Sequence, residues 1–196
     1  MYIKFFKKKI KFSEYFRSNI EKIILERLKE TDKFYLVVPG GSTIKVILKL
    51  LNSIAIDWSK IYLIFSDERC VPIYNDLRND LIIDKHLREY NFLKKLNFIR
   101  IPAELGPKEG TNKFKKILDR IPDFDLCILG FGEDGHTASL FPNHSALKNK
   151  SSAVAITNSP KFPPNRISIG GESLDEDEDY NLFDEEGYGL YSEYTY

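Results

Sequence analysis

The sequence predicts an α/β protein in which a doubly wound, mainly parallel sheet is flanked by helices. Short apolar runs, the length of buried strands, alternate with longer segments in which apolar residues recur at helical spacing. Glycine-rich and charged stretches directly follow several of the apolar runs. Because ligands bind beyond the carboxyl ends of the strands in such sheets, these stretches are expected to form one site.

The expected strands are short and almost continuously apolar, as strands buried on both faces are. Residues 34–38, for example, read FYLVV and stop at Pro39-Gly40-Gly41, which indicates a tight turn. The full set of strands is predicted at residues 34–38, 61–65, 97–101, 124–129, 153–157 and 166–169.

The expected helices fill the intervals between these strands. In the first of them apolar side chains recur at helical spacing, and Ser13 is placed to cap its N-terminus. Ser42 and Thr43 can cap the second in the same way. Helices are predicted at residues 13–29, 44–51, 80–94 and 107–118.

Composition excludes several classes of protein. The chain has 196 residues, 42% of them hydrophobic and 30% charged, which is typical of a globular domain. Its two cysteines, Cys70 and Cys127, are far apart, so a disulfide framework or a cysteine metal cluster is not expected. No apolar stretch reaches the length of a membrane span, and the basic start of the chain lacks a signal-peptide core. We therefore expect a cytoplasmic protein.

Charge divides the chain into two parts. The first 169 residues hold all 29 basic and 19 acidic residues, a net charge of +10, and the remaining residues carry ten acids and no base. We expect an α/β domain at residues 1–169 and an acidic, aromatic-containing tail without regular structure at residues 170–196. The Lys-rich stretches at residues 7–11 and 113–116 are interpreted as solvated faces, so no nucleic-acid or membrane partner is expected.

Three of the polar stretches offer groups for binding an anion. Gly40-Gly41-Ser42-Thr43 lies between a strand and a helix, where free N–H groups and the helix dipole suit a phosphate. The alternative is an ordinary turn with an N-cap, and the Lys of a Walker motif is missing. After the next strand, Arg69 can bind a phosphate or carboxylate and Asp67 can orient a hydroxyl, unless they form a surface ion-pair cluster. Further along, the proline-rich loop adds Lys161 and Arg166, although prolines are also common in ordinary loops.

The stretch GFGEDGHTASLF places His136 after a strand and among glycines. A metal site is a poor interpretation, because no second His or Cys lies at ligand spacing. A neutral imidazole is well suited to take a proton from water, and either Asp134 or Glu133 could hold its tautomer. The glycines are expected to turn the strand end into a helix. The residues that would support His136 are Gly132, Glu133, Asp134 and Gly135.

The combination resembles a known family. The stretches are PGGSTIKVILKLL, IDWSKIYLIFSDERCVP, IPAELGP, FDLCILGFGEDGHTASLFPNHSAL and TNSPKFPPNRISI. In this order, from about residue 33 to 169, they resemble the 6-phosphogluconolactonases, within the wider group that includes glucosamine-6-phosphate isomerase/deaminase. The deaminase branch has Asp-Glu-Tyr where this chain has Asp-Glu-Arg69, and Ile-Ala-Phe-Asn where this chain has Thr-Ala-Ser-Leu140.

The resemblance implies a Rossmann-type α/β enzyme that hydrolyses 6-phospho-D-glucono-1,5-lactone to 6-phospho-D-gluconate in the oxidative pentose phosphate pathway, with no metal and no cofactor. It implies that His136 activates water as general base, and that Asp67 helps to orient the substrate or the base. The substrate and phosphate shell that it implies is Gly40, Gly41, Ser42, Thr43, Arg69, Lys161 and Arg166. The only partner expected is the phosphosugar lactone, for a monomer or a weak homodimer.

The chain departs from the family after Ile169, where relatives continue with the rest of a strand, a helix, another strand and a final helix. We therefore expect a fold that lacks the last strand-helix units of the family. Two alternatives stay open. One is a phosphosugar-binding protein with impaired catalysis, and the other is a glucosamine-6-phosphate deaminase/isomerase.

Overall fold

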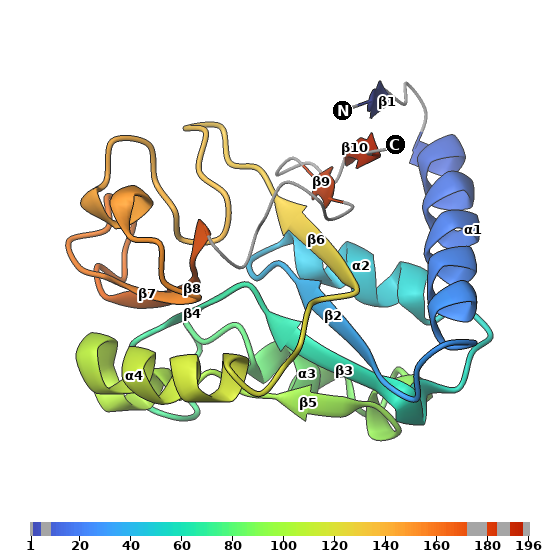
Figure 1. Ribbon diagram of the computed structural model, residues 1–196, viewed down its shortest axis with the longest axis horizontal. Coiled ribbons are helices and arrows are strands. Elements are labelled where there is room, and N and C mark those ends of the chain that lie inside the picture. Colours follow the sequence, from blue (N-terminus) through green and yellow to red (C-terminus); the bar gives the residue numbers. More distant parts are fainter. Residues whose placement is uncertain (1, 5–8, 172–179, 184–188, 194–196) are drawn as a thin grey trace.

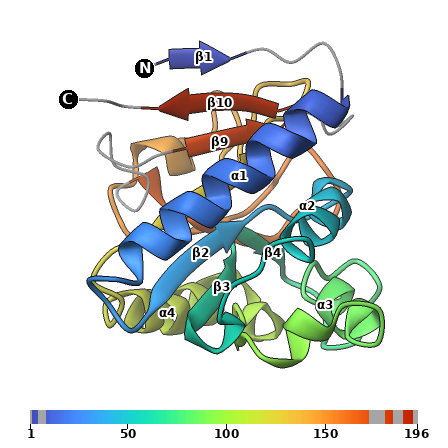
Figure 2. The same cartoon turned by 90° about the vertical axis from the view of Figure 1, so that its right-hand side faces the viewer.

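The computed structural model of the protein describes residues 2–4, 9–171, 180–183 and 189–193. The backbone forms a larger and a smaller sheet with helices packed around them (Figure 1). Helices α1 (Lys9–Arg27) and α2 (Thr43–Leu51) lie on one face of the larger sheet, and the smaller sheet lies on its other side with α4 (Gly106–Leu118) (Figure 2).

The larger sheet has the strand order β1-β10-β9-β6-β2-β3-β5. From β9 to β5 all neighbours are parallel, whereas β10 and β1 are antiparallel to the strands beside them. The doubly wound, mainly parallel sheet predicted from the sequence is confirmed. Its strands are β1 (Tyr2–Lys4), β2 (Phe34–Val38), β3 (Ile61–Phe65), β5 (Asn97–Ile99), β6 (Leu126–Gly130), β9 (Tyr180–Phe183) and β10 (Gly189–Glu193).

The smaller sheet is antiparallel and has the order β4-β8-β7. Its strands are β4 (Asp67–Arg69), β7 (Ala153–Ile156) and β8 (Arg166–Ile169). The sequence predicted β7 and β8 but not that they leave the main sheet. The reason is the loop between them, which is shorter than the dozen or more residues that a parallel crossover needs, so the two strands pair as a hairpin.

Two helix predictions need correction. Helix α1 begins at Lys9, so Ser13 lies inside the helix and does not cap it. The helix predicted at residues 80–94 is also wrong in length, because α3 (Leu81–His86) ends early and a separate 3-10 helix covers Asn91–Lys94. Packing explains the break, since Phe92 is buried with its ring centroid 4.4 Å from that of Trp58.

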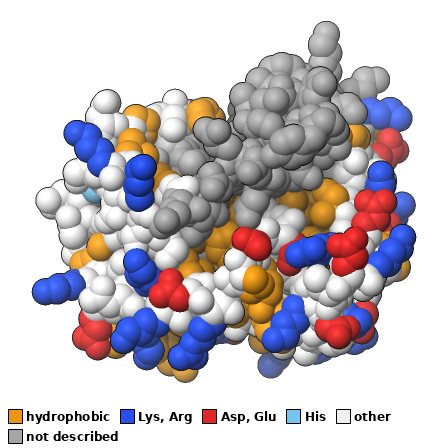
Figure 3. Space-filling view, viewed as in Figure 1, with side chains coloured by type: hydrophobic (Ala, Val, Ile, Leu, Met, Phe, Trp, Pro, Cys, Tyr) orange, Lys and Arg blue, Asp and Glu red, His pale blue; other side chains and the backbone are white. Residues whose placement is uncertain are grey.

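Helices α1 and α2 bury the larger sheet on one face. Strands β2, β3 and β6 are almost entirely buried, which explains why their sequences are continuous apolar runs. The core residues that these two helices contribute include Phe16, Ile20, Ile24, Ile47, Leu48 and Leu51. Among the described residues, each helix is too short or too polar to cross a bilayer. The basic stretch at residues 113–116 lies on α4, and its lysines are exposed. Blue side chains gather at the lower left of Figure 3, where Figure 1 shows α4 in the same view.

The predicted acidic tail is only partly described. Residues 172–179, 184–188 and 194–196 lie outside the described residues, and so do residues 7 and 8 of the first Lys-rich stretch. The backbone of β9 pairs in parallel with β6, and that of β10 pairs with β9 and β1. This differs from the expectation that the tail has no regular structure, since the free edge of β6 offers backbone groups for pairing. The division at residue 169 stays a prediction.

A buried carboxylate joins α1 to the sheet. Asp125 precedes β6, and its side chain accepts hydrogen bonds from the Tyr35 backbone N–H at 2.7 Å and from Arg27 Nε at 2.6 Å. The side chain of Asp125 is 5% exposed, so these donors replace the water that it would otherwise bind.

Replacing Asp125 with alanine is expected to lower the free energy of unfolding by about 2 kcal/mol, because a buried backbone donor and a cation lose their acceptor. Asp32→Ala is the matched control. Asp32 pairs with Lys60 at 3.3 Å but is almost fully exposed, so its loss should cost less than about 0.5 kcal/mol. Urea denaturation measures both, and equal losses would contradict the role given to Asp125.

Candidate active site

A pocket of about 320 Å³ opens at the carboxyl ends of β2, β3 and β6, where the sequence placed the site. Most of the predicted site residues meet there. Those that line the pocket are Gly40, Gly41, Ser42, Thr43, Asp67, Arg69, Gly132, His136, Lys161 and Arg166. The pocket wall also contains residues that the sequence analysis did not select, namely Pro39, Ser66, Gly130, Phe131, Ala138 and Phe162.

The turn after β2 forms one wall of the pocket. Gly41 has φ +66°, a conformation that favours glycine, and its N–H donates to Asn79 Oδ1 at 3.2 Å. At Gly40 an added Cβ would lie 2.2 Å from Asn79 Nδ2, so only glycine fits against this side chain. Ser42 occupies the N-cap position of α2 as predicted, but its side chain makes no capping hydrogen bond. The exposed Ser42 hydroxyl is therefore not committed to the helix.

Glu68 fixes the segment that carries Asn79. Its buried carboxylate accepts backbone hydrogen bonds from Arg69 at 2.8 Å, from Asn79 at 2.8 Å and from Asp80 at 2.9 Å. Burial raises the pKa of Glu68 to about 7, against the opposing effect of these N–H donors. Asn79 then bridges two parts of the site, because its side chain also donates to the Asp67 carbonyl at 2.9 Å. The sequence analysis missed both roles.

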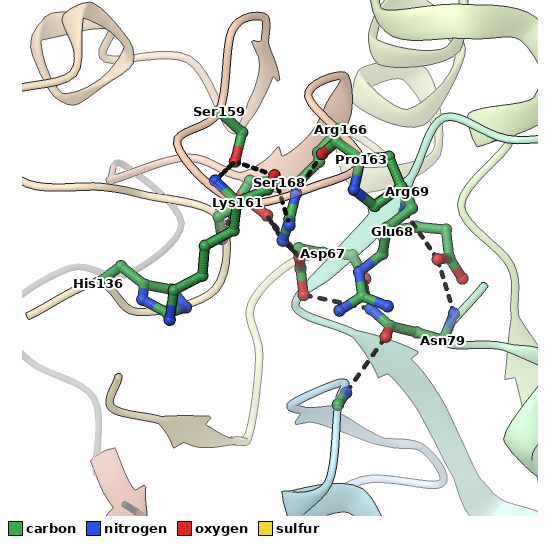
Figure 4. A network of polar contacts seen from close by, with 12 residues as sticks. Asp67, Glu68, Arg69, Asn79, His136, Ser159, Lys161, Pro163, Arg166 and Ser168 are labelled. Carbon is green, nitrogen blue, oxygen red and sulfur yellow. Dashed lines mark hydrogen bonds and ion pairs between the residues drawn. The ribbon is translucent and has the colours of Figure 1, made fainter. Parts of the chain in front are cut away.

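Asp67 lies deeper in the wall than the sequence suggested. Its carboxylate accepts from Ser139 Oγ at 2.5 Å and lies 3.9 Å from Arg166 Nη1. No hydrogen bond or ion pair among the described residues joins Asp67 to His136, and Figure 4 shows their side chains apart. In this geometry Asp67 does not orient the imidazole.

His136 is oriented by Asp134. The ring nitrogen Nδ1 hydrogen-bonds to Asp134 Oδ1, and the ring stacks on Phe141 with centroids 4.6 Å apart. The hydrogen bond to His136 lowers the pKa of Asp134, with smaller help from the charges of His136 and Lys161. Glu133, the other carboxylate considered, is exposed. The second ring nitrogen, Nε2, has no partner in the described part of the chain.

The loop after β6 does not turn into a helix, contrary to the prediction. It folds back on itself, with Gly132 N–H donating to the His136 carbonyl at 2.9 Å and Gly135 N–H to the Gly132 carbonyl at 2.8 Å. Gly135 has φ +80°, and a Cβ on Gly132 would lie 2.3 Å from the imidazole ring. The glycines therefore serve a tight return and close contact with the ring. In place of the expected helix, Thr137 forms isolated antiparallel bridges with Phe131 and with Leu140.

The predicted cations differ in what they contact. Arg166 is almost fully buried, and it donates to the carbonyls of Pro163 at 3.0 Å, Lys161 at 3.1 Å and Phe162 at 3.3 Å. It therefore holds the proline-rich loop in place, and burial lowers the pKa of its guanidinium. Lys161 Nζ, by contrast, lies 3.5 Å from Asp134 Oδ1 and is partly exposed.

Arg69 anchors one end of its guanidinium and leaves the rest near the pocket. Its Nη1 donates to the Leu77 carbonyl at 2.7 Å, while Nε is buried without a partner among the described residues. A buried N–H donor without an acceptor indicates a place where a ligand oxygen or water would be stabilised. In the described part of the chain, no cluster of His, Cys, Asp and Glu is arranged to hold a metal ion.

The chain is similar to known proteins in sequence and in fold. The sequence matches the family described as glucosamine-6-phosphate isomerases/6-phosphogluconolactonase over residues 8–179. The probable 6-phosphogluconolactonase 4 of Arabidopsis thaliana is 36% identical over 169 residues, which cover 72% of this chain and 62% of the relative. The human 6-phosphogluconolactonase is 34% identical over 149 residues, which cover 70% of this chain and 58% of the relative.

Solved structures show the same fold. A 6-phosphogluconolactonase from Shewanella baltica superposes with a TM-score of 0.77 at 28% identity, covering 91% of this chain and 78% of that structure. The chain spans only about half to two thirds of the length of the curated relatives that it matches, from 49% to 62% in the cases compared.

Gly40→Ala is expected to lower the free energy of unfolding by roughly 1 to 3 kcal/mol, because the new methyl group displaces the buried Asn79 side chain. Gly171→Ala provides the control, since a Cβ there meets nothing within 4 Å. Thermal melts of both variants decide the matter. A Gly40→Ala protein as stable as the control would show that Asn79 does not brace the turn.

The stability of the protein should depend on the ionisation of Glu68. Because its folded pKa of about 7 lies above the ordinary value of 4.5, its contribution is fully present below pH 4.5 and is lost as the pH rises through 7. Between pH 5 and pH 8 the wild type should therefore lose on the order of 2 kcal/mol more than Glu68→Gln, which cannot ionise.

Urea midpoints at several pH values measure this difference. Glu109→Gln, at an exposed position on α4, should follow the pH dependence of the wild type. Parallel curves for the wild type and Glu68→Gln would show that the Glu68 carboxyl does not titrate in this range.

Proposed function

The chain belongs to the family of glucosamine-6-phosphate isomerases and 6-phosphogluconolactonases, and from this premise we propose that it hydrolyses 6-phospho-D-glucono-1,5-lactone to 6-phospho-D-gluconate. The observation that carries the proposal is the pairing of His136 with Asp134 on the wall of a pocket that also holds Arg69 and Lys161. A base and fixed positive charge in one pocket suit an anionic ester.

His136 acts as the general base in this reaction. With Nδ1–H donated to Asp134, the neutral imidazole presents Nε2 as an acceptor for a proton of water. The water oxygen forms a bond to the lactone carbonyl carbon as its proton moves to Nε2. The carbonyl then re-forms as the ring C–O bond breaks, and the leaving ring oxygen takes the proton from the imidazolium to become a hydroxyl group. The new carboxylic acid releases its remaining proton to solvent. Asp134 stabilises that imidazolium, and no covalent enzyme intermediate is needed because a lactone is an activated ester.

The phosphate binds at the turn after β2. Gly41, Ser42 and Thr43 lie at the N-terminus of α2, where the helix dipole favours negative charge. Arg69 and Lys161 add positive charge for the phosphate and for the oxyanion that develops during attack. Arg166, which the family resemblance assigns to the same shell, contributes mainly by holding the Lys161 loop. The pocket volume of about 320 Å³ is within the range of small-ligand sites.

The deaminase/isomerase alternative has less support. Arg69 stands where the deaminases have tyrosine, and Ser139 and Leu140 stand where they have phenylalanine and asparagine. We place the lactonase reaction in the cytoplasm and in the pentose phosphate pathway. The expectation of a monomer or weak homodimer stays a prediction.

His136→Asn is expected to reduce kcat for lactone hydrolysis by about 10²- to 10⁴-fold, because asparagine cannot accept the proton of water. His86→Asn is the control, since His86 lies on α3 and contacts Glu89 outside the pocket. Acid release from freshly made lactone, corrected for spontaneous hydrolysis, measures both variants.

If the wild type hydrolyses the lactone no faster than the spontaneous reaction, the lactonase proposal is wrong. In that case, a rise in melting temperature with 6-phosphogluconate would support the alternative of a binding protein without turnover. Release of ammonia from glucosamine 6-phosphate would support the deaminase alternative instead.

A further inference from the structure

Ser139 is a buried hydroxyl that neither accepts the catalytic proton nor lines the pocket. It has no exposed surface, and its Oγ donates to Asp67 Oδ2 at 2.5 Å. Its backbone N–H donates to Ser168 Oγ on β8 at 3.3 Å. Ser139 is thus the point at which the loop carrying His136 is tied to both β4 and β8.

The contacts continue from Ser139 to the loop that carries Lys161. Arg166 Nη1 lies 3.5 Å from Ser139 Oγ and 3.9 Å from Asp67 Oδ2. The other nitrogens of Arg166 donate to the carbonyls of Lys161, Phe162 and Pro163. Figure 4 shows Asp67 and Arg166 between the Lys161 loop and the Asn79 segment.

We propose that Ser139 is a positioning residue that fixes the separation of His136 and Lys161 through Asp67 and Arg166. This inference rests on the proposed function, because the two side chains it places are the base and a substrate-binding cation. The Ser139 hydroxyl suits the task, since it donates to Asp67 and accepts from Arg166 at the same time.

Hydrogen bonds and a bridge within the loop connect Ser139 to His136. Between His136 and Ser139 the chain is held by a bridge from Thr137 to Leu140 and by the Leu140 N–H, which donates to the Thr137 carbonyl at 2.8 Å. The Gly132 N–H holds the His136 carbonyl itself. A shift of Ser139 therefore moves the imidazole relative to the bound lactone.

Thr137 offers a matched control in the same loop. Its Oγ1 is buried but has no hydrogen-bond partner among the described residues, and it does not line the pocket. Thr137→Val and Ser139→Ala each remove one buried hydroxyl within three residues of His136. Only Ser139→Ala breaks the connection to Asp67 and Arg166.

The experiment compares lactone hydrolysis by the wild type, Ser139→Ala and Thr137→Val. We expect kcat/KM to fall roughly 10- to 100-fold in Ser139→Ala, the size of loss that a small misplacement of reacting groups causes. Thr137→Val should stay within about twofold of the wild type, because it breaks no hydrogen bond. The proposal would be overturned if Ser139→Ala were as active as the wild type, or if both variants lost the same amount of activity.

Amide hydrogen exchange gives a second readout that does not depend on turnover. The N–H groups of Ser159 and Lys161 are held by internal hydrogen bonds, to the Pro164 carbonyl at 2.9 Å and to Ser159 Oγ at 3.2 Å. Their exchange should be faster in Ser139→Ala than in Thr137→Val. Unchanged exchange would contradict the connection between the two loops, whether or not the wild type is an active lactonase. Absence of lactonase activity in the wild type would by itself overturn only the proposed function.

Ser139→Cys covers the case in which Ser139→Ala fails to fold. Cysteine nearly keeps the shape of serine but donates weakly, so this variant should fold and still lose rate and loop protection. A folded Ser139→Cys protein with wild-type rate and exchange would overturn the proposal.

Discussion

The buried carboxylate of Glu68 is the constraint on which the site depends. A carboxylate removed from water must be surrounded by donors, and here the donors are three backbone N–H groups, two of them in the segment of Asn79 and Asp80. That segment is thereby fixed against β4, and Asn79 in turn holds Gly41 and the Asp67 carbonyl. One buried carboxyl group thus positions the turn after β2 relative to the end of β3.

Two loops then close the pocket from the other side. The first carries His136 after β6, and the second carries Lys161 between β7 and β8. Both contact the short β4 through Asp67, which bonds to Ser139 and lies near Arg166. The antiparallel smaller sheet is what makes this possible, because pairing of β8 with β4 brings the proline-rich loop back over the strand ends. The charged residues that the sequence offered as ligands therefore have two different roles. Asp67 and Arg166 are buried and hold the loops in place, whereas Arg69 and Lys161 are more accessible from the pocket.

The sequence predicted the parallel sheet, its strand ends and ten of the sixteen residues of the pocket wall, because apolar runs and glycine-rich turns are local signals. It could not assign roles that depend on pairing between distant segments. The sequence analysis predicted that Arg166 binds an anion. In the structure its guanidinium instead donates to carbonyls of the loop between β7 and β8. The family resemblance implied that Asp67 orients the substrate or His136, but its carboxylate accepts a hydrogen bond from Ser139, which is 72 positions away in the chain. The prediction of a helix after the glycine-rich turn was wrong for a related reason. The chain folds back on itself there, and the ring of His136 packs on that of Phe141.

We propose above all that His136, held by Asp134, activates water against a phosphosugar lactone. The most direct test uses phosphorus NMR to measure the rate at which the lactone disappears with the wild type and with Asp134→Asn. Asparagine can accept from Nδ1–H but does not stabilise the imidazolium as a carboxylate does, so the account predicts a wild-type rate above buffer and a loss of about tenfold or more in the variant. A variant as fast as the wild type, or a wild type as slow as buffer, would contradict the claim.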